Sequence, residues 1–248
     1  MIALCLLCRN PTEIWCSFLS KCLYDVWVVV DYPLPLDTLR YWKGRYPSIT
    51  FLSGYDQDEM SVREAGFVNI NFIMRKDITA WERGLYHFAV TVQGKYDHVW
   101  FFEDDVFIPT ASAIYNLDLK YPESDLLSNT CWRTQKVRQQ DWHWSNIDIP
   151  FPPPYWTGMM CIVRMSQRFL SLLRDYGMRE KTFFFLEAMF PTLVKRSSLV
   201  HHCPREFASV VYRKTYHYTD IRPECLYHPI KNLNDQAFYR QYLAHAIS

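Results

Sequence analysis

Three apolar runs in the first half of the chain constrain its fold more than any other feature. They lie at residues 2–8 (IALCLLC), 24–31 (YDVWVVVD) and 97–105 (DHVWFFEDD). Their apolar residues are consecutive, which is typical of parallel strands buried on both faces. Segments with helical signals separate them, from about Thr12, at 36–46 and at 77–92. This β-α-β alternation predicts a mainly parallel, twisted sheet flanked by helices, a Rossmann-like α/β fold.

The rest of the chain continues this pattern with weaker signals. We expect further strands at 48–53, 68–74, 124–132 and 157–165, and helices at 166–177 and 182–196. Ser166 is the expected cap of the first of these helices and Gly177 its C-terminal residue, whereas Pro191 should interrupt the second. With 248 residues, 49% of them hydrophobic, the chain can form one packed domain, which we take to be 1–248.

The charge balance and the cysteines limit the classes of partner and location. With 27 basic and 26 acidic residues the net charge is +1, so no overall field attracts nucleic acid or an anionic membrane. The apolar start, MIALCLLC, is too short to be a transmembrane segment and lacks the features of a signal peptide. Eight cysteines without a secretion signal favour free thiols, so we expect a cytoplasmic protein. Cys5-x-x-Cys8 lies inside a predicted strand, and no second pair completes a zinc site.

The third apolar run ends in three consecutive acids, Glu103, Asp104 and Asp105. Like charges this close raise one another's pKa or need a cation to neutralise them. The carboxyl ends of strands in an open α/β sheet are also where ligands bind. The acids therefore indicate a metal site, although a helix cap beside a solvated turn would explain them too.

Three later features have chemistry that could complete such a site. Trp156-Thr157-Gly158 opens a predicted strand, Glu187 lies in an apolar helix, and His228 lies in the sequence YHPIK. Taken singly, they are also explained by a turn, an exposed helical acid, and a surface or core histidine. The phenylalanine-rich sequence around Glu187 leaves it little polar surface, so we expect burial to raise its carboxyl pKa toward neutrality.

Taken in order, these features resemble the nucleotide-sugar-dependent glycosyltransferases of the GT-A fold. The matching segments are EDD at 103–105 for the DxD metal motif, WTG at 156–158 for the glycine loop, FLEA at 185–188 for the xED motif, and YHPIK at 227–231 for a late histidine. The resemblance implies a GT-A-like fold with a nucleotide-sugar-binding half at 1–109. The acceptor-binding half, at 110–248, would carry the catalytic acid and the late metal ligand. The chain departs from the family where Glu103 replaces the first Asp of DxD and where FLEA lacks a paired acid.

The resemblance also implies roles on the donor side. Asp105 becomes a metal ligand with Glu103 as its helper, and His228 becomes the third contact to the metal. Asp104 would lie near the donor sugar and Lys231 near the diphosphate. Carboxylate and diphosphate oxygens suit Mn²⁺ or Mg²⁺, and an added imidazole favours Mn²⁺. The expected donor is a nucleoside-diphosphate sugar, and we expect it to be UDP-linked.

The ends of the first two predicted strands supply candidates for binding the nucleoside. Arg9 and Asn10 end the first strand and Asp31 ends the second. A surface cation and a turn-forming acid would explain Arg9 and Asp31 equally well. Arg83, on the helix before the acids, either reaches the phosphates or forms a surface ion pair.

The aromatic stretch before and within the glycine loop is the predicted acceptor side, because Trp and Tyr rings stack on sugar-like ligands. A packed loop with a solvated basic edge is the alternative. The candidates are Trp142, His143, Trp144, Tyr155, Trp156, Thr157 and Gly158, with Arg133, Lys136 and Arg138 at the rim.

These assignments predict an inverting glycosyl transfer with Glu187 as general base. A partly desolvated carboxylate suits removal of a proton from the acceptor hydroxyl as that hydroxyl attacks the anomeric carbon. A retaining transfer would need no such base. Two other classes stay open: a metal-dependent phosphohydrolase or nuclease using the acids with His201, His202 and His228, and a non-catalytic nucleotide-sugar-binding module on the same fold.

Overall fold

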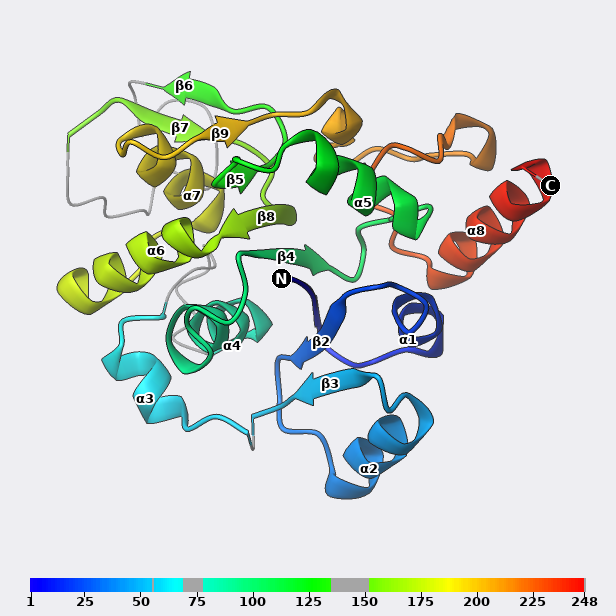
Figure 1. Cartoon of the computed structure of the whole chain (residues 1–248), viewed down its shortest axis with the longest axis horizontal. Coiled ribbons are helices and arrows are strands. Elements are labelled where there is room, and N and C mark those ends of the chain that lie inside the picture. The colour runs from blue at the N-terminus through cyan, green and yellow to red at the C-terminus, as the bar shows by residue number, and fades with distance from the viewer. Residues whose placement is uncertain (55, 69–77, 135–151, 248) are drawn as a thin grey trace.

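A computed structural model of the chain describes residues 1–54, 56–68, 78–134 and 152–247 (Figure 1). Its centre is a seven-stranded sheet with the order β3-β2-β1-β4-β8-β5-β9. The strands are β1 (Ile2–Cys8), β2 (Asp25–Val30), β3 (Ile49–Leu52), β4 (His98–Glu103), β5 (Leu126–Leu127), β8 (Ile162–Ser166) and β9 (His201–His202). All neighbouring pairs are parallel except those of β8, which is antiparallel to β4 and β5. The prediction of a single α/β domain with a mainly parallel sheet is confirmed.

Helices cover both faces of this sheet (Figure 1). One face packs against α1 (Glu13–Leu19), α2 (Leu36–Arg45) and α5 (Ala111–Lys120). The other packs against α3 (Glu59–Glu64), α4 (Ala80–Tyr86) with its π-helical continuation η1 (His87–Thr91), α6 (Gln167–Glu180) and α7 (Leu186–Lys195). The last helix, α8 (Leu233–Ile247), adds a smaller apolar cluster around Phe107.

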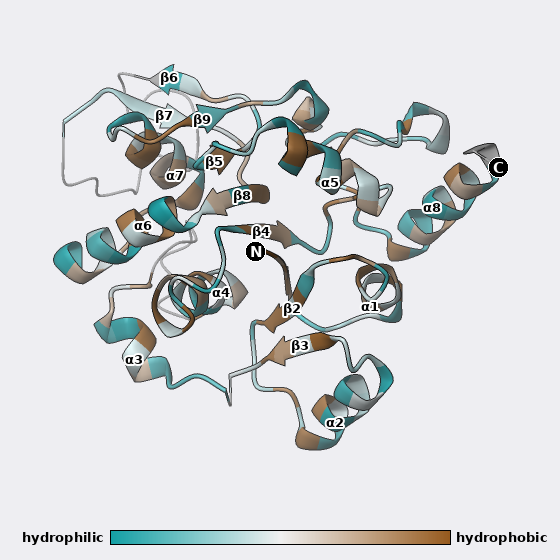
Figure 2. Cartoon of the chain, viewed as in Figure 1, coloured by the Kyte–Doolittle hydropathy of each residue, from teal (hydrophilic) through white to brown (hydrophobic). Residues whose placement is uncertain are grey.

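The apolar runs are continuous because successive side chains in a strand point to opposite faces of the sheet, and both faces are covered by helices. In β1, Ala3, Cys5 and Leu7 face the core beneath α4 and α6, while Leu4, Leu6 and Cys8 face the core beneath α1 and α5; none is more than 4% exposed. Figure 2 shows the result as hydrophobic strands between helices that are hydrophobic on one side and hydrophilic on the other. A strand covered on both faces has no position at which a polar residue would be solvated.

The α6 helix begins as predicted but ends later. The Ser166 hydroxyl accepts a hydrogen bond from the Phe169 N–H at 3.1 Å, whereas Gly177 lies inside the helix, which ends at Lys181 with φ of 58°. Gly177 serves close packing instead of termination. A Cβ there would lie 2.9 Å from the Ala65 carbonyl oxygen, and a Cβ on Gly66, whose φ is +81°, would overlap the Gly177 carbonyl. The prediction of a C-terminal glycine was therefore wrong.

The interruption predicted at Pro191 is also absent, since α7 continues through this residue. A proline has no N–H, so the carbonyl four residues earlier, that of Glu187, loses its helical donor. The Gly158 N–H donates to that carbonyl at 3.1 Å. The helix thus tolerates proline because a segment from elsewhere replaces the missing hydrogen bond.

The second half of the chain forms shorter strands than expected. The strand predicted at 124–132 shrinks to the two residues of β5, and the one predicted at 68–74 lies almost entirely outside the described residues. Two small sheets form beside the main one: β6 (Trp132–Thr134) with β7 (Tyr155–Thr157), and β10 (Ser209–Val210) with β11 (Tyr227–His228). All eight cysteines are free thiols. Within the described ranges, no helix combines the length and the apolar character needed to cross a membrane.

Candidate functional site

The parallel strands β1, β2 and β4 end at one edge of the sheet, where a cleft of about 740 Å³ opens. This is the position at which open α/β sheets bind ligands. The fold brings to this cleft many of the residues singled out from the sequence. Its lining includes Arg9, Asp31, Glu103, Asp104, Asp105, Glu187, His228 and Lys231.

At the centre of the cleft lies a group that we call the acid–histidine cluster, made of Glu103, Asp105 and His228. One carboxylate oxygen of each acid and one imidazole nitrogen all lie within 4.8 Å of one another. Glu103 ends β4, while His228 ends β11, far along the chain. Backbone hydrogen bonds join these two segments, from the Phe107 N–H to the Tyr227 carbonyl at 2.8 Å and from the Ile230 N–H to the Asp105 carbonyl at 2.7 Å.

A neighbouring side chain and a backbone carbonyl fix two members of the cluster. The Trp81 indole Nε1 donates to Glu103 Oε1 at 2.7 Å, and His228 Nδ1 donates to the Val211 carbonyl at 2.9 Å. This second hydrogen bond leaves His228 Nε2 directed at Asp105 Oδ1, 3.4 Å away. Asp105 Oδ1 is buried and accepts no hydrogen bond from any residue within the described ranges. A buried carboxylate oxygen without a donor is costly unless a cation or a proton compensates it.

The electrostatics of the cluster reflect the crowding of its charges. Burial, followed by the nearby Asp105, raises the pKa of Glu103 to about 7. Burial and Asp105 also raise the pKa of Asp104. Burial alone would lower the pKa of His228, but Asp105 outweighs it and raises this pKa above its ordinary value. Two carboxylates and an imidazole that attract positive charge, with an Asp105 oxygen that accepts no hydrogen bond within the described ranges, fit a divalent cation.

Glu187 lies across the same cleft in the first turn of α7 and is half-buried. Burial, and then repulsion from Glu103, raises its carboxyl pKa to about 7, in agreement with the expectation from the sequence. Its backbone carbonyl accepts the Gly158 N–H described above. The predicted glycine loop therefore supports the helix turn that carries Glu187, although Gly158 itself lies outside the cleft lining in the described part of the chain.

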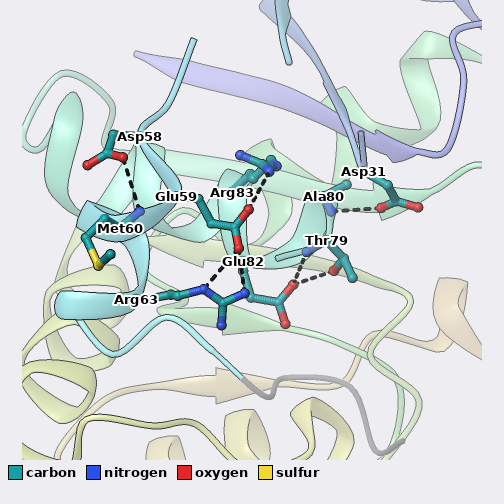
Figure 3. A network of polar contacts seen from close by, with 9 residues as sticks. All are labelled: Asp31, Asp58, Glu59, Met60, Arg63, Thr79, Ala80, Glu82 and Arg83. Atoms are coloured by element: carbon teal, nitrogen blue, oxygen red, sulfur yellow. Dashed lines mark hydrogen bonds and ion pairs between the residues drawn. The ribbon is translucent and has the colours of Figure 1, made fainter. Parts of the chain in front are cut away.

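Only some of the other donor-side candidates line the cleft. Asp31 Oδ1 accepts the Ala80 N–H at 2.8 Å, so this carboxylate both lines the cleft and holds the start of α4 (Figure 3). Asn10 is exposed next to Arg9. Arg83 points away: its side chain is 4% exposed, and its Nη2 lies 4.0 Å from Glu59 Oε2 (Figure 3). Among the described residues, the cleft lining includes neither Asn10 nor Arg83.

Figure 3 also shows why α4 is well anchored at the rim of the cleft. The Thr79 N–H donates to Glu82 Oε2 at 2.8 Å, as part of a capping box, and Glu59 pairs with Arg63 on α3. A capping box satisfies N–H groups that the first turn of a helix leaves without partners. The anchored helix presents Trp81 to Glu103.

The predicted acceptor residues fall into two groups. Tyr155, Trp156 and Thr157 form β7, which packs against α7; the Trp156 N–H donates to Thr192 Oγ1 at 2.9 Å, and the Thr192 hydroxyl donates to the Trp156 carbonyl. Arg133 is exposed on β6. The remaining candidates, Trp142, His143, Trp144, Lys136 and Arg138, lie outside the described residues.

The cleft also contains residues that the sequence did not single out. Tyr32, Met159, Tyr212 and Arg213 line it. Arg213 is exposed, has a positive φ of 55°, and lies with its Cζ 4.9 Å from the centre of the Tyr212 ring. The sequence signal for this part of the cleft is the run of adjacent aromatic and basic residues YRK at 212–214. That signal is weak, because only the tertiary structure places Tyr212 and Arg213 in the same cleft as Lys231.

The chain is a single α/β domain with a mainly parallel seven-stranded sheet flanked by helices. Among solved structures, the chain is similar to 4-diphosphocytidyl-2C-methyl-D-erythritol synthase from Anaerococcus prevotii, with 11% identity, a TM-score of 0.50 and 98% of each chain covered. Mouse xyloside xylosyltransferase 1 in its apo form matches with 9% identity and a TM-score of 0.42, over 82% of this chain and 85% of the mouse chain. No protein-family model and no curated protein sequence matches. At 11% identity the similarity to the synthase shows the fold alone, and the match to the xylosyltransferase supports no further conclusion.

Proposed function

We propose that this protein is a metal-dependent glycosyltransferase that moves a sugar from a nucleoside-diphosphate sugar, UDP-linked, to a glycan or other hydroxyl acceptor. The observation that carries the proposal is the convergence of Glu103, Asp105 and His228 within 4.8 Å, in a cleft that Glu187 also lines. A cation site and a separate carboxyl with a pKa of about 7 are the groups that such a transfer requires.

Asp105 and His228 would hold the cation, and Glu103, oriented by Trp81, would complete the set. When bound, Mn²⁺ or Mg²⁺ would supply positive charge to offset the charge that develops on the departing nucleoside diphosphate. His228 is well suited to this task because its Nδ1 is already engaged by a backbone carbonyl, which fixes the tautomer with a lone pair on Nε2.

The exposed cations Arg213 and Lys231, which both line the cleft, bind the diphosphate of the donor. Arg9 and Asp31, at the ends of β1 and β2, bind the nucleoside. The Tyr32 ring, 5.9 Å from Arg9 Cζ, offers a flat apolar face to the base. Asp104 contacts the donor sugar.

Glu187 acts as the general base of an inverting displacement. Its carboxylate accepts the proton of the acceptor hydroxyl while the hydroxyl oxygen attacks the anomeric carbon and the bond to the diphosphate breaks. A base is most effective when its pKa is near the working pH, and burial raises the pKa of Glu187 to about 7. The Gly158 N–H holds the backbone of this residue in place.

The hydrolase alternative requires the acids to act with His201 and His202. In the described part of the chain these histidines lie on the edge strand β9 and do not line the cleft. The cleft supplies one imidazole, that of His228, and the transferase accounts for this set of ligands with a single cation.

The test is a panel of nucleotide sugars with Mn²⁺, scored first by thermal stabilisation, which reports binding by mass action, and then by release of nucleoside diphosphate with hydroxyl acceptors. The expected result is stabilisation by a UDP-sugar that depends on Mn²⁺ and turnover that a chelator stops. Release of phosphate from simple esters would instead establish a hydrolase. Donor binding without turnover on any acceptor would establish a binding module.

A further inference from the structure

A second group of metal-ligating side chains lies outside the cleft, at the far edge of the sheet. It consists of Cys131, which precedes β6, His201, which begins β9, and Cys203, which follows β9. We call it the thiol–imidazole cluster. Its two sulfurs and the His201 Nε2 all lie within 4.8 Å of one another. None of these residues lines the cleft in the described part of the chain.

The distances within this cluster match those around a tetrahedral zinc ion. With zinc about 2.3 Å from sulfur and about 2.0–2.1 Å from nitrogen, tetrahedral geometry separates a sulfur from a nitrogen by about 3.6 Å. The His201 Nε2 lies 3.5 Å from the Cys203 sulfur and 3.8 Å from the Cys131 sulfur. One nitrogen thus faces both sulfurs at the separation that a shared ion would impose.

The local structure explains why these atoms converge. His201 and Cys203 are two residues apart on extended chain, and side chains at this spacing point to the same side. Cys131 approaches from the segment that links β5 to β6. The Ser128 hydroxyl lies 2.8 Å from the same His201 nitrogen, so the fourth side of the cluster is polar. Cys131 and His201 are half-buried and Cys203 is exposed, which gives an ion a path from solvent.

We propose that Cys131, His201 and Cys203 bind a Zn²⁺ ion, with a water molecule or the Ser128 hydroxyl in the fourth position. Two thiolates and an imidazole are soft and borderline ligands that select zinc over Mn²⁺ or Mg²⁺. Both cysteines bind the ion as thiolates, and their two negative charges balance the charge of the ion. A disulfide between the cysteines would not account for an imidazole that faces both sulfurs.

The ion cross-links segments of the chain that are far apart in the sequence. Cys131 packs on Gly158, where a Cβ would lie only 3.0 Å from its sulfur, and the Gly158 N–H donates to the Glu187 carbonyl. Zinc at this position ties the edge strand β9 to the strands β6 and β7 and, through Gly158, to the first turn of α7. The site is structural, because no described residue of the cluster faces the cleft.

The experiment uses Co²⁺ as a spectroscopic substitute for zinc in the reduced, metal-free full chain. Sulfur ligands give cobalt a charge-transfer absorption in the near ultraviolet, which the oxygen and nitrogen ligands of the acid–histidine cluster cannot produce. We expect one equivalent of Co²⁺ to give this absorption together with tetrahedral ligand-field bands, and Zn²⁺ to displace it. Cys203→Ser should lower the intensity of the band per bound cobalt, since one of two sulfurs is lost, and should weaken Co²⁺ affinity by more than the ~100-fold that loss of a supporting contact causes.

Two control variants separate the sites. Cys225→Ser changes another partly exposed cysteine, and Asp105→Ala changes the acid–histidine cluster; both should keep the cobalt band. The proposal is overturned if the reduced wild-type protein shows no sulfur-to-cobalt band, or if Cys203→Ser keeps both the full band intensity and the parental Co²⁺ affinity. A Cys131–Cys203 disulfide whose reduction yields no metal binding would overturn it as well. Because Cys203 is exposed, its replacement leaves no cavity, and an unchanged circular dichroism spectrum will verify that the variant folds.

Discussion

The acid–histidine cluster and the thiol–imidazole cluster each gather three ligand atoms within 4.8 Å, yet they differ in charge and in surroundings. The first crowds carboxylates at the end of β4, and the crowding raises the pKa of Glu103 to about 7. It also opens into a cleft of about 740 Å³. The second is built from two cysteines and a histidine at the sheet edge. The acid–histidine cluster has repelling charges that a cation would neutralise, and it adjoins a cleft large enough for a ligand, so it suits a catalytic metal site. The thiol–imidazole cluster adjoins no such cleft among the described residues, so it suits a structural metal site.

The largest effect is expected for Asp105→Ala, which removes one of the two carboxylates of the acid–histidine cluster. This change should abolish Mn²⁺-dependent donor binding and leave the fold intact, because it relieves repulsion in the metal-free protein. Isothermal titration of donor with and without Mn²⁺ measures it. Asp37→Ala, at an exposed residue on α2, is the matched control. Parental donor and Mn²⁺ binding by the Asp105 variant would mean that this cluster is not the metal site.

The next largest effect is expected for Glu187→Gln. The amide keeps the size of the side chain but cannot accept the acceptor's proton, so the transfer rate should fall by ~10²–10⁴ while donor affinity stays near the parental value. Calorimetry for donor binding and turnover at saturating substrates separate the two quantities. Glu123→Gln, on the surface before β5, should change neither. If the variant keeps more than about a tenth of parental turnover, Glu187 is not the general base. That result would point to a retaining transfer.

A smaller effect is expected for His228→Ala, because both carboxylates remain. Mn²⁺ affinity should fall by ~10–100-fold, as when supporting interactions at a metal site are lost. Titration of Mn²⁺ followed by its electron paramagnetic resonance signal measures the change, with His245→Ala on the exposed face of α8 as the control. Equal Mn²⁺ affinity in both variants would make His228 a structural histidine.

The smallest effect concerns pH. Burial holds the pKa of Glu187 at about 7 in the folded protein against an ordinary 4.5. Below pH 4.5 both the folded and unfolded chains keep this proton, and as the pH rises toward 7 the unfolded chain ionises first. The free energy of unfolding of the metal-free protein should therefore fall across this range, by about 1–2 kcal/mol from this group after allowance for its partial exposure.

Denaturant titrations of the chelator-treated protein at several pH values test this slope. Glu187→Gln should reduce the pH dependence, because an amide does not titrate, and Glu123→Gln should leave it unchanged. Identical slopes for parent and Glu187→Gln would show that burial does not shift this pKa. The measurement needs no substrate, so it isolates the electrostatics of the cleft from the question of activity.

Much of the fold could be predicted because its signals are local. Continuous apolar runs at β1, β2 and β4 require two covering layers of helices, and the Thr12 and Ser166 caps mark where helices begin. The acids at 103–105 follow directly from the end of β4, so their place at the sheet edge was also determined locally. The insertion of β8 antiparallel between β4 and β5 was not, because the same apolar run would fit a parallel strand equally well.

The sequence by itself determined the α/β architecture and a group of crowded acids at the carboxyl end of a central strand, since hydrophobic periodicity and like-charge repulsion act between neighbours in the chain. Only the tertiary structure decided which distant residues meet. It placed His228 beside Asp105, and it supplied the Gly158 N–H as the donor that Pro191 lacks, so that α7 continues through the proline. It also brought together Cys131, His201 and Cys203, whose spacing in the sequence matches no short zinc motif. Such contacts depend on packing between segments far apart in the sequence, and no local pattern of residues specifies them.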